Sequence, residues 1–317
     1  MRVTVLAGGV GGARFLLGLR ELGHSVTVVG NVGDDIWLHG LRVCPDLDTV
    51  IYTLGGGIHD GQGWGRAGET FTLRDELTAY GEKDTEWFTL GDRDLATHIV
   101  RTRILADGGT LTAATRALCD RWRPGITLLP STDEEAETLV HLATGETVHF
   151  QEWWIRLRAA TPATGFTFGG LTATASPHAV AAILGADVVL LPPSNPVVSI
   201  GAILALPDIL RAVQLTRAPV VGLSPIIGGS PVRGHADACL AAVGIETSAE
   251  AVARGYGARS AGGVLDGWLV DTKDSACVDA LTADGLPTRA VPLLMADVPA
   301  TAAMAAAALA LAAELRR

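Results

Sequence analysis

Short runs of β-branched and other apolar residues alternate with helix-length amphipathic stretches along almost the whole chain. This alternation is typical of a mostly parallel β-sheet whose two faces are covered by helices. The expected fold class is therefore α/β, with a doubly wound, Rossmann-like sheet. Seven runs are predicted as its strands: residues 2–6, 25–29, 126–129, 187–191, 219–223, 267–270 and 288–291.

Helices are predicted over residues 13–22, 94–106, 111–121, 177–184 and 301–315. Residues 139–142 and 147–150 flank Thr144-Gly145-Glu146 and are predicted as an antiparallel hairpin. Residues from about 55 to 123 contain no convincing strand and are predicted as a smaller helical insertion that caps the core. Because no linker or low-complexity tract divides the chain, one elaborated α/β domain over residues 1–317 is expected.

Composition excludes several classes of partner. Lys and Arg number 24 against 34 Asp and Glu, a net charge of −10, so the chain lacks the basic surface of a nucleic-acid-binding protein. The four cysteines lie far apart without a C-x-x-C pair, which fits a reducing, cytoplasmic location. The alanine-rich segment 300–315 is shorter than the ~20 residues of a membrane span. It is predicted as a buried helix, with no membrane partner.

A glycine-rich motif, Ala7-Gly-Gly-Val-Gly-Gly-Ala-Arg14, follows the first predicted strand and precedes a helix. Glycines let the backbone approach a phosphate, and a helix N-terminus offers free N–H groups. From Gly9, however, Arg14 stands where a dinucleotide fingerprint has Gly or Ala, and the chain has no Gly-Lys-Ser/Thr P-loop. Taken alone, the motif also fits a tight strand-to-helix turn.

Two more loops follow predicted strands: Pro192-Pro-Ser-Asn-Pro196 and Ser224-Pro-Ile-Ile-Gly-Gly229. Ligands of open parallel sheets bind at the carboxyl ends of the strands, where all three loops would meet. Asn195 offers donors and an acceptor to a base edge, and the serines and the Gly228 backbone suit phosphate oxygens. Three ordinary turns are the alternative, but a nucleotide site is favoured. Its predicted residues are Gly8, Gly9, Gly11, Gly12, Arg14, Ser194, Asn195, Ser224 and Gly228.

Carboxylates cluster in Gly33-Asp-Asp35, in Pro45-Asp-Leu-Asp-Thr49 and in Gly91-Asp-Arg-Asp94. Asp46 precedes an apolar run and is suited to cap a helix, as is Asp94. A second carboxylate at the same helix start, Asp48, would then be free to hold Mg²⁺. Metal binding at Asp46 and Asp48 and simple capping both remain open. Trp37, beside these segments, is suited to stack on a heteroaromatic ring.

Seven motifs in order resemble the 2-phospho-L-lactate/phosphoenolpyruvate transferase family of coenzyme F(420) biosynthesis. The resemblance covers residues 2 to about 300, and residues 7–16 and 40–48 most resemble the actinobacterial branch. The motifs are Val5-Leu-Ala-Gly-Gly-Val-Gly-Gly-Ala-Arg-Phe15, Gly30-Asn-Val-Gly-Asp-Asp35, Pro45-Asp-Leu-Asp-Thr49, Gly91-Asp-Arg-Asp-Leu-Ala-Thr-His98, His149-Phe-Gln-Glu-Trp-Trp154, Pro193-Ser-Asn-Pro-Val-Val-Ser199 and Ser224-Pro-Ile-Ile-Gly228.

The resemblance implies a homodimeric, Mg²⁺-dependent transferase. Such enzymes transfer the phosphoenolpyruvyl or phospholactyl group from a guanosine diphosphate ester to the ribityl hydroxyl of the deazaflavin Fo. GMP is released, and the enolpyruvyl donor yields dehydro coenzyme F(420)-0. The resemblance further implies that Asp48 lies at the Mg²⁺ and the acceptor hydroxyl, with Asp46 close by, and that Arg93 and Trp37 face the deazaflavin.

The alternative is a nucleotide-sugar-binding regulatory protein of the related gluconeogenesis-factor family. In that family the counterpart of residues 45–49 lacks the second carboxylate, whereas this chain keeps Asp48, which favours the enzyme. A nicotinamide dehydrogenase is less favoured, because the glycine fingerprint is incomplete and Asn31, rather than an acid, follows the second strand.

Overall fold

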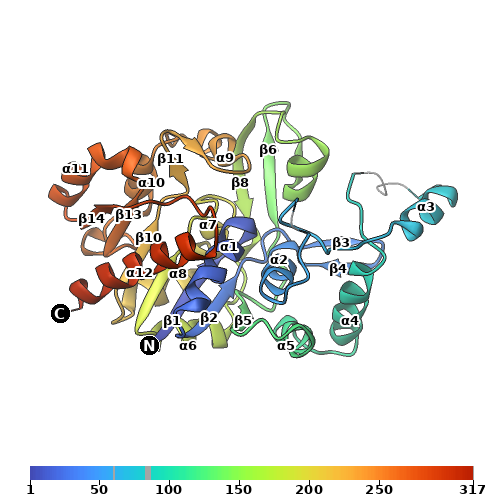
Figure 1. Cartoon of the computed structure of the whole chain (residues 1–317). Coiled ribbons are helices and arrows are strands. Elements are labelled where there is room, and N and C mark those ends of the chain that lie inside the picture. Colours follow the sequence, from blue (N-terminus) through green and yellow to red (C-terminus); the bar gives the residue numbers. More distant parts are fainter. Residues whose placement is uncertain (60, 83–86, 317) are drawn as a thin grey trace.

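The computed structural model describes residues 1–59, 61–82 and 87–316, with a seven-stranded parallel sheet at the centre (Figure 1). The strand order is β14-β13-β10-β9-β1-β2-β5. The predicted α/β class and all seven predicted strands are confirmed, and each strand end agrees to within one residue. The strands are β1 (Arg2–Ala7), β2 (Ser25–Gly30), β5 (Thr127–Pro130), β9 (Val188–Leu191), β10 (Val220–Leu223), β13 (Gly267–Val270) and β14 (Thr288–Ala290).

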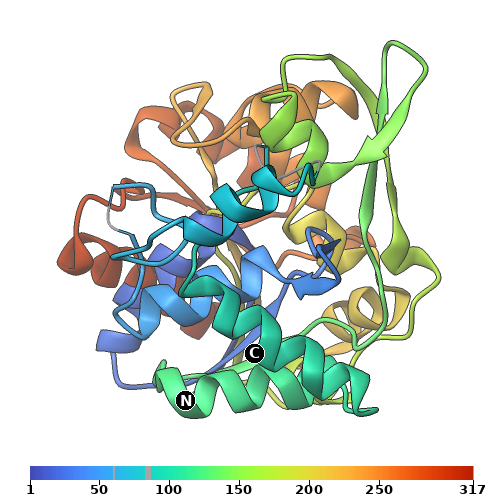
Figure 2. The same cartoon turned by 90° about the vertical axis from the view of Figure 1, so that its right-hand side faces the viewer.

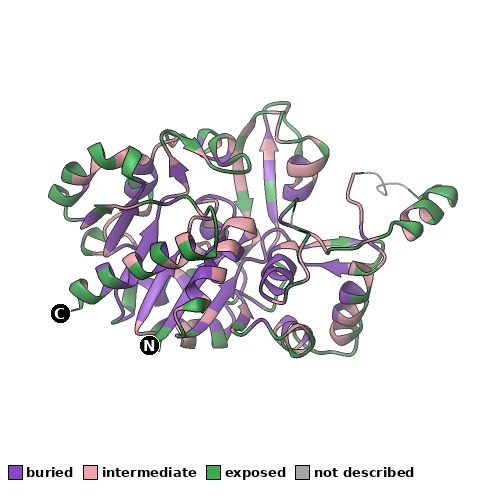
Figure 3. Ribbon diagram, in the orientation of Figure 1, coloured by how far each residue is buried: buried purple, intermediate pink, exposed green. Residues whose placement is uncertain are grey.

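Helices cover both faces of this sheet (Figure 1). α1 (Gly9–Glu21) and α12 (Val298–Leu315) pack on each other over one face, and α6 (Pro177–Leu184) and α8 (Pro207–Leu215) pack on each other over the opposite face. Strands β9, β10 and β13 are buried along their whole length, which explains why they are continuous apolar runs (Figure 3). Further helices are α7 (Ile200–Leu204), α9 (Ala236–Ala242), α10 (Ala249–Tyr256) and α11 (Val278–Ala283).

Three smaller sheets surround the central one. The predicted hairpin is confirmed as β6 (Thr138–Leu142) and β7 (Thr147–His149), and an unpredicted strand, β8 (Ala163–Phe168), pairs with β6. Two hairpins were also not predicted, because strands of two or three residues are too short to show a period. They are β3 (Ile36–Leu38) with β4 (Leu41–Val43), and β11 (Ile226–Ile227) with β12 (Ser230–Pro231).

The region predicted as a helical insertion contains α3 (Thr72–Ala79), α4 (Asp94–Ala106) and α5 (Leu111–Trp122). It follows α2 (Pro45–Leu54), on which α5 packs. Figure 2 shows α3, α4 and α5 together on one side of the molecule, and α3 has no buried residue. The division into a core and an inserted cap stays a prediction.

Helix α12 is long and apolar enough to span a membrane by length and composition alone. In the structure it packs on α1 and on strands β9, β10 and β13, with Met304, Ala308 and Leu311 among its buried side chains. The prediction of a buried helix in this segment is therefore confirmed. The contact is closest at Gly18 of α1, where an added Cβ would lie 2.4 Å from the Ala302 nitrogen.

We expect Gly18→Ala to destabilise the protein by about 1–3 kcal/mol, because the methyl group forces α1 and α12 apart in a packed core. Urea unfolding followed by circular dichroism measures this change. The exposed Glu21→Ala on the same helix is the control and should change the free energy of unfolding by less than ~0.5 kcal/mol. Equal effects of the two substitutions would contradict the packing described here.

Candidate functional site

A cavity of about 1100 Å³ opens at the carboxyl edge of the central sheet. The loops that follow β1, β2, β9, β10 and β14 all contribute to its lining, as do residues of the 59–71 and 87–91 segments. The sheet is extended from β1 toward β2 on one side and toward β9 on the other. Such a switch point is where open α/β sheets bind ligands, and the loops after β1 and β9 meet there.

The glycine motif forms the start of helix α1. Gly8 is the N-cap and the helix begins at Gly9, so the prediction of a loop as far as residue 12 was wrong. An added Cβ would lie 2.5 Å from Asp46 Oδ2 at Gly8 and 2.2 Å from the Pro193 oxygen at Gly11. The missing side chains thus let three segments approach closely, and they leave the helix N-terminus facing the cavity. Gly8, Gly9, Gly11 and Arg14 line the cavity, whereas Gly12 packs against Ala7 and Ser194.

The loop after β9 uses its polar side chains within the protein. Ser194 Oγ donates to the Gly8 oxygen at 2.9 Å and so joins the first two loops. Asn195 Oδ1 accepts the N–H groups of Val197 (2.9 Å) and Val198 (3.2 Å), which fixes the turn that follows. Both Ser194 and Asn195 line the cavity. The Asn195 amide oxygen, which was predicted to read a base edge, is thus already paired with backbone.

The loop after β10 behaves in the same way. Ser224 lines the cavity, but its Oγ exchanges hydrogen bonds with the backbone of Ile226. The Gly228 N–H, predicted to bind phosphate, donates to both carboxylate oxygens of Asp274 at 3.0 and 3.1 Å, and Gly228 does not line the cavity. The structure therefore brings Ser224 to the cavity but not Gly228.

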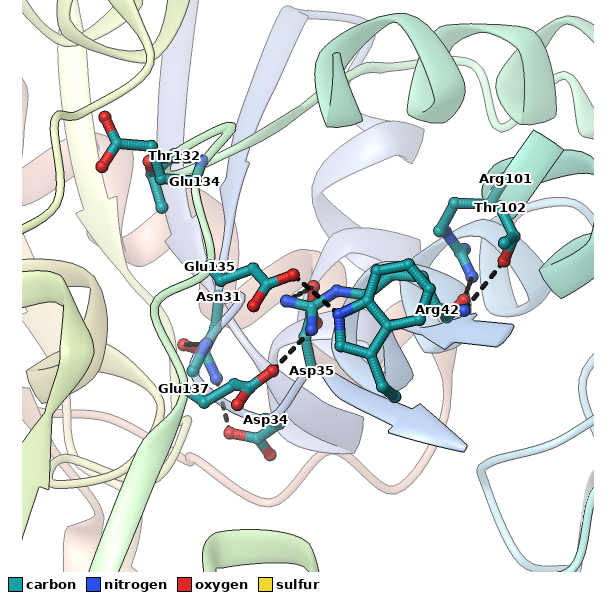
Figure 4. A network of polar contacts seen from close by, with 12 residues as sticks. Asn31, Asp34, Asp35, Arg42, Arg101, Thr102, Thr132, Glu134, Glu135 and Glu137 are labelled. Carbon is teal, nitrogen blue, oxygen red and sulfur yellow. Dashed lines mark hydrogen bonds and ion pairs between the residues drawn. The ribbon is translucent and has the colours of Figure 1, made fainter. Parts of the chain in front are cut away.

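Asp34 and Asp46 form a buried pair of carboxylates in the cavity wall. Asn31 Nδ2 lies 2.8 Å from Asp34 Oδ1 and 2.8 Å from Asp46 Oδ2, so one amide holds both (Figure 4 shows the Asn31–Asp34 contact). Burial, together with repulsion from Asp46, raises the pKa of Asp34 well above its usual value. Burial likewise raises the pKa of Asp46 to about 6. Two carboxylates that repel each other at a cavity surface suit a bound cation.

Asp48 is two residues further along α2 and faces a different group. Residues at i and i+2 of a helix do not share a face, so Asp46 points to the core loops and Asp48 to α4. There the buried Arg101 guanidinium pairs with Asp48 Oδ1. Burial raises the pKa of Asp48, and Arg101 opposes that rise. Among the residues that the structure describes, Asp48 Oδ2 has no hydrogen-bond partner, although Asp48 lines the cavity.

Asp46 and Asp94, which were considered as helix caps, are not the N-cap residues of α2 and α4. Helix α2 has Cys44 at the N-cap and Pro45 at its first position, and Asp46 makes no capping hydrogen bond. Helix α4 has Arg93 at the N-cap, while the Asp94 carboxylate accepts from the Tyr52 hydroxyl and lies 3.4 Å from His98 Nε2. Within the described part of the chain, no group of three or more His, Cys, Asp or Glu side chains is placed to hold a metal ion.

Arginines and aromatic residues complete the lining; Arg14 was predicted to be part of the site, whereas Arg66 and Arg233 were not. Arg14 and Arg233 lie close enough for burial and mutual repulsion to lower the pKa of Arg14. Arg66 stacks on the Trp122 and Tyr52 rings. Arg233 stands in an ordinary Val-Arg-Gly tripeptide, so nothing in the sequence indicates that it lies in the cavity wall. The apolar part of the lining includes Trp64, Phe71, Trp87, Phe88 and Trp154.

Trp37 and Arg93, predicted to face a deazaflavin, are not among the residues that line the cavity. The Trp37 indole donates to Glu135 at 2.7 Å (Figure 4). The Arg93 backbone N–H donates to Glu69 at 2.8 Å, and its carbonyl oxygen accepts from Arg66 at 2.7 Å. Arg66, by contrast, does line the cavity.

Comparison with solved structures extends the fold assignment. A protein of the UPF0052 family from Bacillus halodurans superposes with a TM-score of 0.62 at 17% identity, covering 97% of this chain and 98% of that one. At this identity the likeness shows a common fold alone.

Comparison of sequences shows the family. The family model for 2-phospho-L-lactate transferase CofD matches residues 3–289. Proteins named phosphoenolpyruvate transferase are 58% identical in Streptomyces coelicolor, 57% in Thermobifida fusca and 54% in Mycobacterium marinum. These matches cover 98–100% of this chain and 99% of each relative. The chain therefore belongs to the 2-phospho-L-lactate transferase CofD family and is a transferase of coenzyme F(420) biosynthesis.

Proposed function

We propose that the protein transfers a phosphoenolpyruvyl group from a guanosine diphosphate ester to the ribityl hydroxyl of the deazaflavin Fo. The hydroxyl oxygen bonds to the phosphorus that carries the enolpyruvyl group, the bond from that phosphorus to the bridging oxygen breaks, and GMP leaves with the electron pair. The product is dehydro coenzyme F(420)-0. The relatives named phosphoenolpyruvate transferase support this donor over the lactyl one.

The observation that carries this proposal is the free oxygen of Asp48. This carboxylate lines the cavity, its Oδ1 is paired with Arg101, and its Oδ2 is buried without a hydrogen-bond partner among the described residues. A primary alcohol is a weak nucleophile, and a carboxylate within hydrogen-bond reach orients it and accepts its proton. We therefore assign the binding of the acceptor hydroxyl to Asp48 Oδ2.

The cavity lining contains two chemically different sets of residues, and we propose one set for each substrate. The start of α1 with Arg14 and Arg233 suits the anionic donor, because helix N-terminal N–H groups and guanidinium groups bind phosphate. The aromatic lining, with Trp64, Phe88 and Arg66, suits a flat deazaflavin. At about 1100 Å³ the cavity exceeds the ~300–1,000 Å³ of a typical single-ligand site. Its size therefore supports direct transfer between two substrates bound together.

The residues present fit a magnesium ion. Mg²⁺ is commonly held by one or two carboxylates together with substrate phosphates, and Asp34 and Asp46 supply two carboxylates whose mutual repulsion a cation relieves. When bound, the ion would neutralise charge that develops on the transferred phosphoryl group. Asp48 already has a counter-ion in Arg101, so we assign the metal to Asp34 and Asp46 and the acceptor hydroxyl to Asp48.

The reaction is proposed to take place in the cytoplasm, since all four cysteines are free in the structure. The homodimer implied by the family resemblance stays a prediction.

Donor choice is tested by competition. Purified protein, Fo and Mg²⁺ are incubated with equal amounts of the enolpyruvyl and lactyl diphosphate esters, and the products are separated by chromatography and identified by mass. We expect the enolpyruvyl product to dominate. A dominant lactyl product would contradict the proposed donor, and release of GMP without a deazaflavin product would contradict the proposed acceptor.

If Asp34 and Asp46 bind the metal and Asp48 binds the acceptor hydroxyl, substitution of these carboxylates should cause different defects. Asp34→Asn and Asp46→Asn should weaken Mg²⁺ binding, measured by calorimetry with GDP present. Asp48→Asn should leave Mg²⁺ affinity within about threefold but lower kcat by roughly 10²-fold, because general acid–base contributions are of that order. If Asp48→Asn weakens Mg²⁺ binding as much as Asp46→Asn does, the assignment is wrong.

Substitution of the two arginines tests the proposed donor-binding residues. Arg233→Gln and Arg14→Gln should each weaken GDP binding by roughly 10- to 100-fold, since a charge-assisted hydrogen bond contributes about 1.5–3 kcal/mol. Binding of guanosine, which has no phosphate, should change little. Arg66→Gln is the control, because Arg66 stacks on Tyr52 and Trp122 and should not alter GDP affinity. Unchanged GDP affinity in Arg233→Gln would remove Arg233 from the site.

A further inference from the structure

The counter-ion of Asp48 comes from a different part of the chain. Asp48 lies in the first turn of α2, whereas Arg101 lies in α4, within the region predicted as an insertion. Arg101 is fully buried and its NH2 group pairs with Asp48 Oδ1. Its NH1 group lies 3.1 Å from the Arg42 carbonyl oxygen and 3.1 Å from His98 Nδ1. These contacts hold two of the three guanidinium nitrogens, whereas Nε has no hydrogen-bond partner among the described residues.

The same contacts determine the state of His98. A guanidinium group has only donors, so His98 Nδ1 must accept from Arg101 and the ring proton must sit on Nε2. That nitrogen lies 3.4 Å from Asp94 Oδ2, and the Asp94 carboxylate also accepts from the Tyr52 hydroxyl of α2. Polar contacts therefore run from α2 to α4 and back to α2.

In this arrangement one oxygen of Asp48 is fixed and the other is left free. Oδ1 is held by Arg101, while Oδ2 has no hydrogen-bond partner among the described residues and lies 3.7 Å from His98 Nδ1. Asp48 and His98 line the cavity, but Arg101 does not. Arg101 can therefore affect the cavity only through Asp48 and His98, which it contacts.

We infer that Arg101 is a positioning residue for the transfer reaction: it holds the Asp48 carboxylate in the orientation in which Oδ2 receives the acceptor hydroxyl. This inference rests on the proposed function. The inference also gives α4 a function in the reaction, because Arg101 of that helix supplies the positive charge that stabilises a buried, ionised Asp48.

A second buried arginine provides a matched control. Arg42 of β4 is 3% exposed and pairs with Asp35 at 3.6 Å and with Glu137 at 2.6 Å (Figure 4). The Arg42 backbone N–H is already paired, because it donates to the Thr102 hydroxyl of α4 at 2.8 Å. Arg42, Asp35 and Glu137 are all outside the cavity lining. A substitution of the Arg42 side chain therefore removes a buried ion pair of the same kind, while the Arg42 carbonyl oxygen that contacts Arg101 stays in place.

The experiment compares Arg101→Met and Arg101→Lys with Arg42→Met and Arg42→Lys in the full-length protein. Steady-state assays with Fo, the enolpyruvyl donor and Mg²⁺ give kcat and KM, calorimetry gives GDP affinity, and thermal unfolding gives Tm. We expect Arg101→Met to lower kcat at least 10²-fold, with GDP affinity within threefold of wild type. Arg101→Lys, which keeps the charge, should recover at least tenfold of that loss.

The Arg42 variants should lower Tm as the Arg101 variants do but keep kcat within about threefold of wild type. If Arg101→Met and Arg42→Met lower kcat equally, Arg101 has only a structural role and the inference is wrong. Should both methionine variants fail to fold, the lysine pair decides by the same criterion. An inactive wild-type protein would instead overturn the proposed function, and this inference with it.

Discussion

Four buried aspartates lie between the end of β2 and the first turn of α2, and the arrangement of the site follows from how each charge is offset. An ionised carboxylate inside a protein is tenable only with hydrogen bonds or a counter-ion. Asp34 and Asp46 share the Asn31 amide, Asp35 faces Arg42, and Asp48 faces Arg101. Only the pair without a cation of its own lies at the donor loops, and that pair is where a metal ion would be most stabilising.

This pattern also explains why two carboxylates of one motif have different roles. Only Leu47 separates Asp46 from Asp48 in the sequence, and the helix directs the two carboxylates into different surroundings. One turn of α2 thus places a carboxylate beside the N-terminus of α1 and another beside α4.

The sheet and the place of the site were predictable from sequence, because both depend on local patterns. Buried parallel strands are continuous apolar runs, and loops after such strands meet at one edge. The roles of single side chains were less predictable. Asn195 and Gly228 were assigned to a nucleotide by residue type, whereas backbone and Asp274 contacts occupy their polar groups. Helix capping by Asp46 was one of two alternatives left open, and it was wrong because Pro45 shifts the N-cap to Cys44.

Residues that act through tertiary contacts left no signal in the sequence. Arg101 and Arg233 lie 53 and more than 180 residues from Asp48 along the chain, and nothing near either one marks its partner. The family resemblance did not reveal them either, because it was carried by short motifs that contain neither residue. Arg93 was chosen from within one of those motifs and Trp37 from beside another, yet Trp64 and Arg66 line the cavity and these two residues do not.

The contact between α1 and α12 has a consequence for the order in which the site can form. Helix α1 begins at Gly9 and presents its first turn to the cavity, while its Gly18 packs against Ala302 of α12. During synthesis on the ribosome, α1 emerges early and its packing partner emerges almost three hundred residues later. Helix α1 therefore reaches its final packing only after translation has passed α12, so one wall of the cavity stays incomplete for most of the synthesis of the chain.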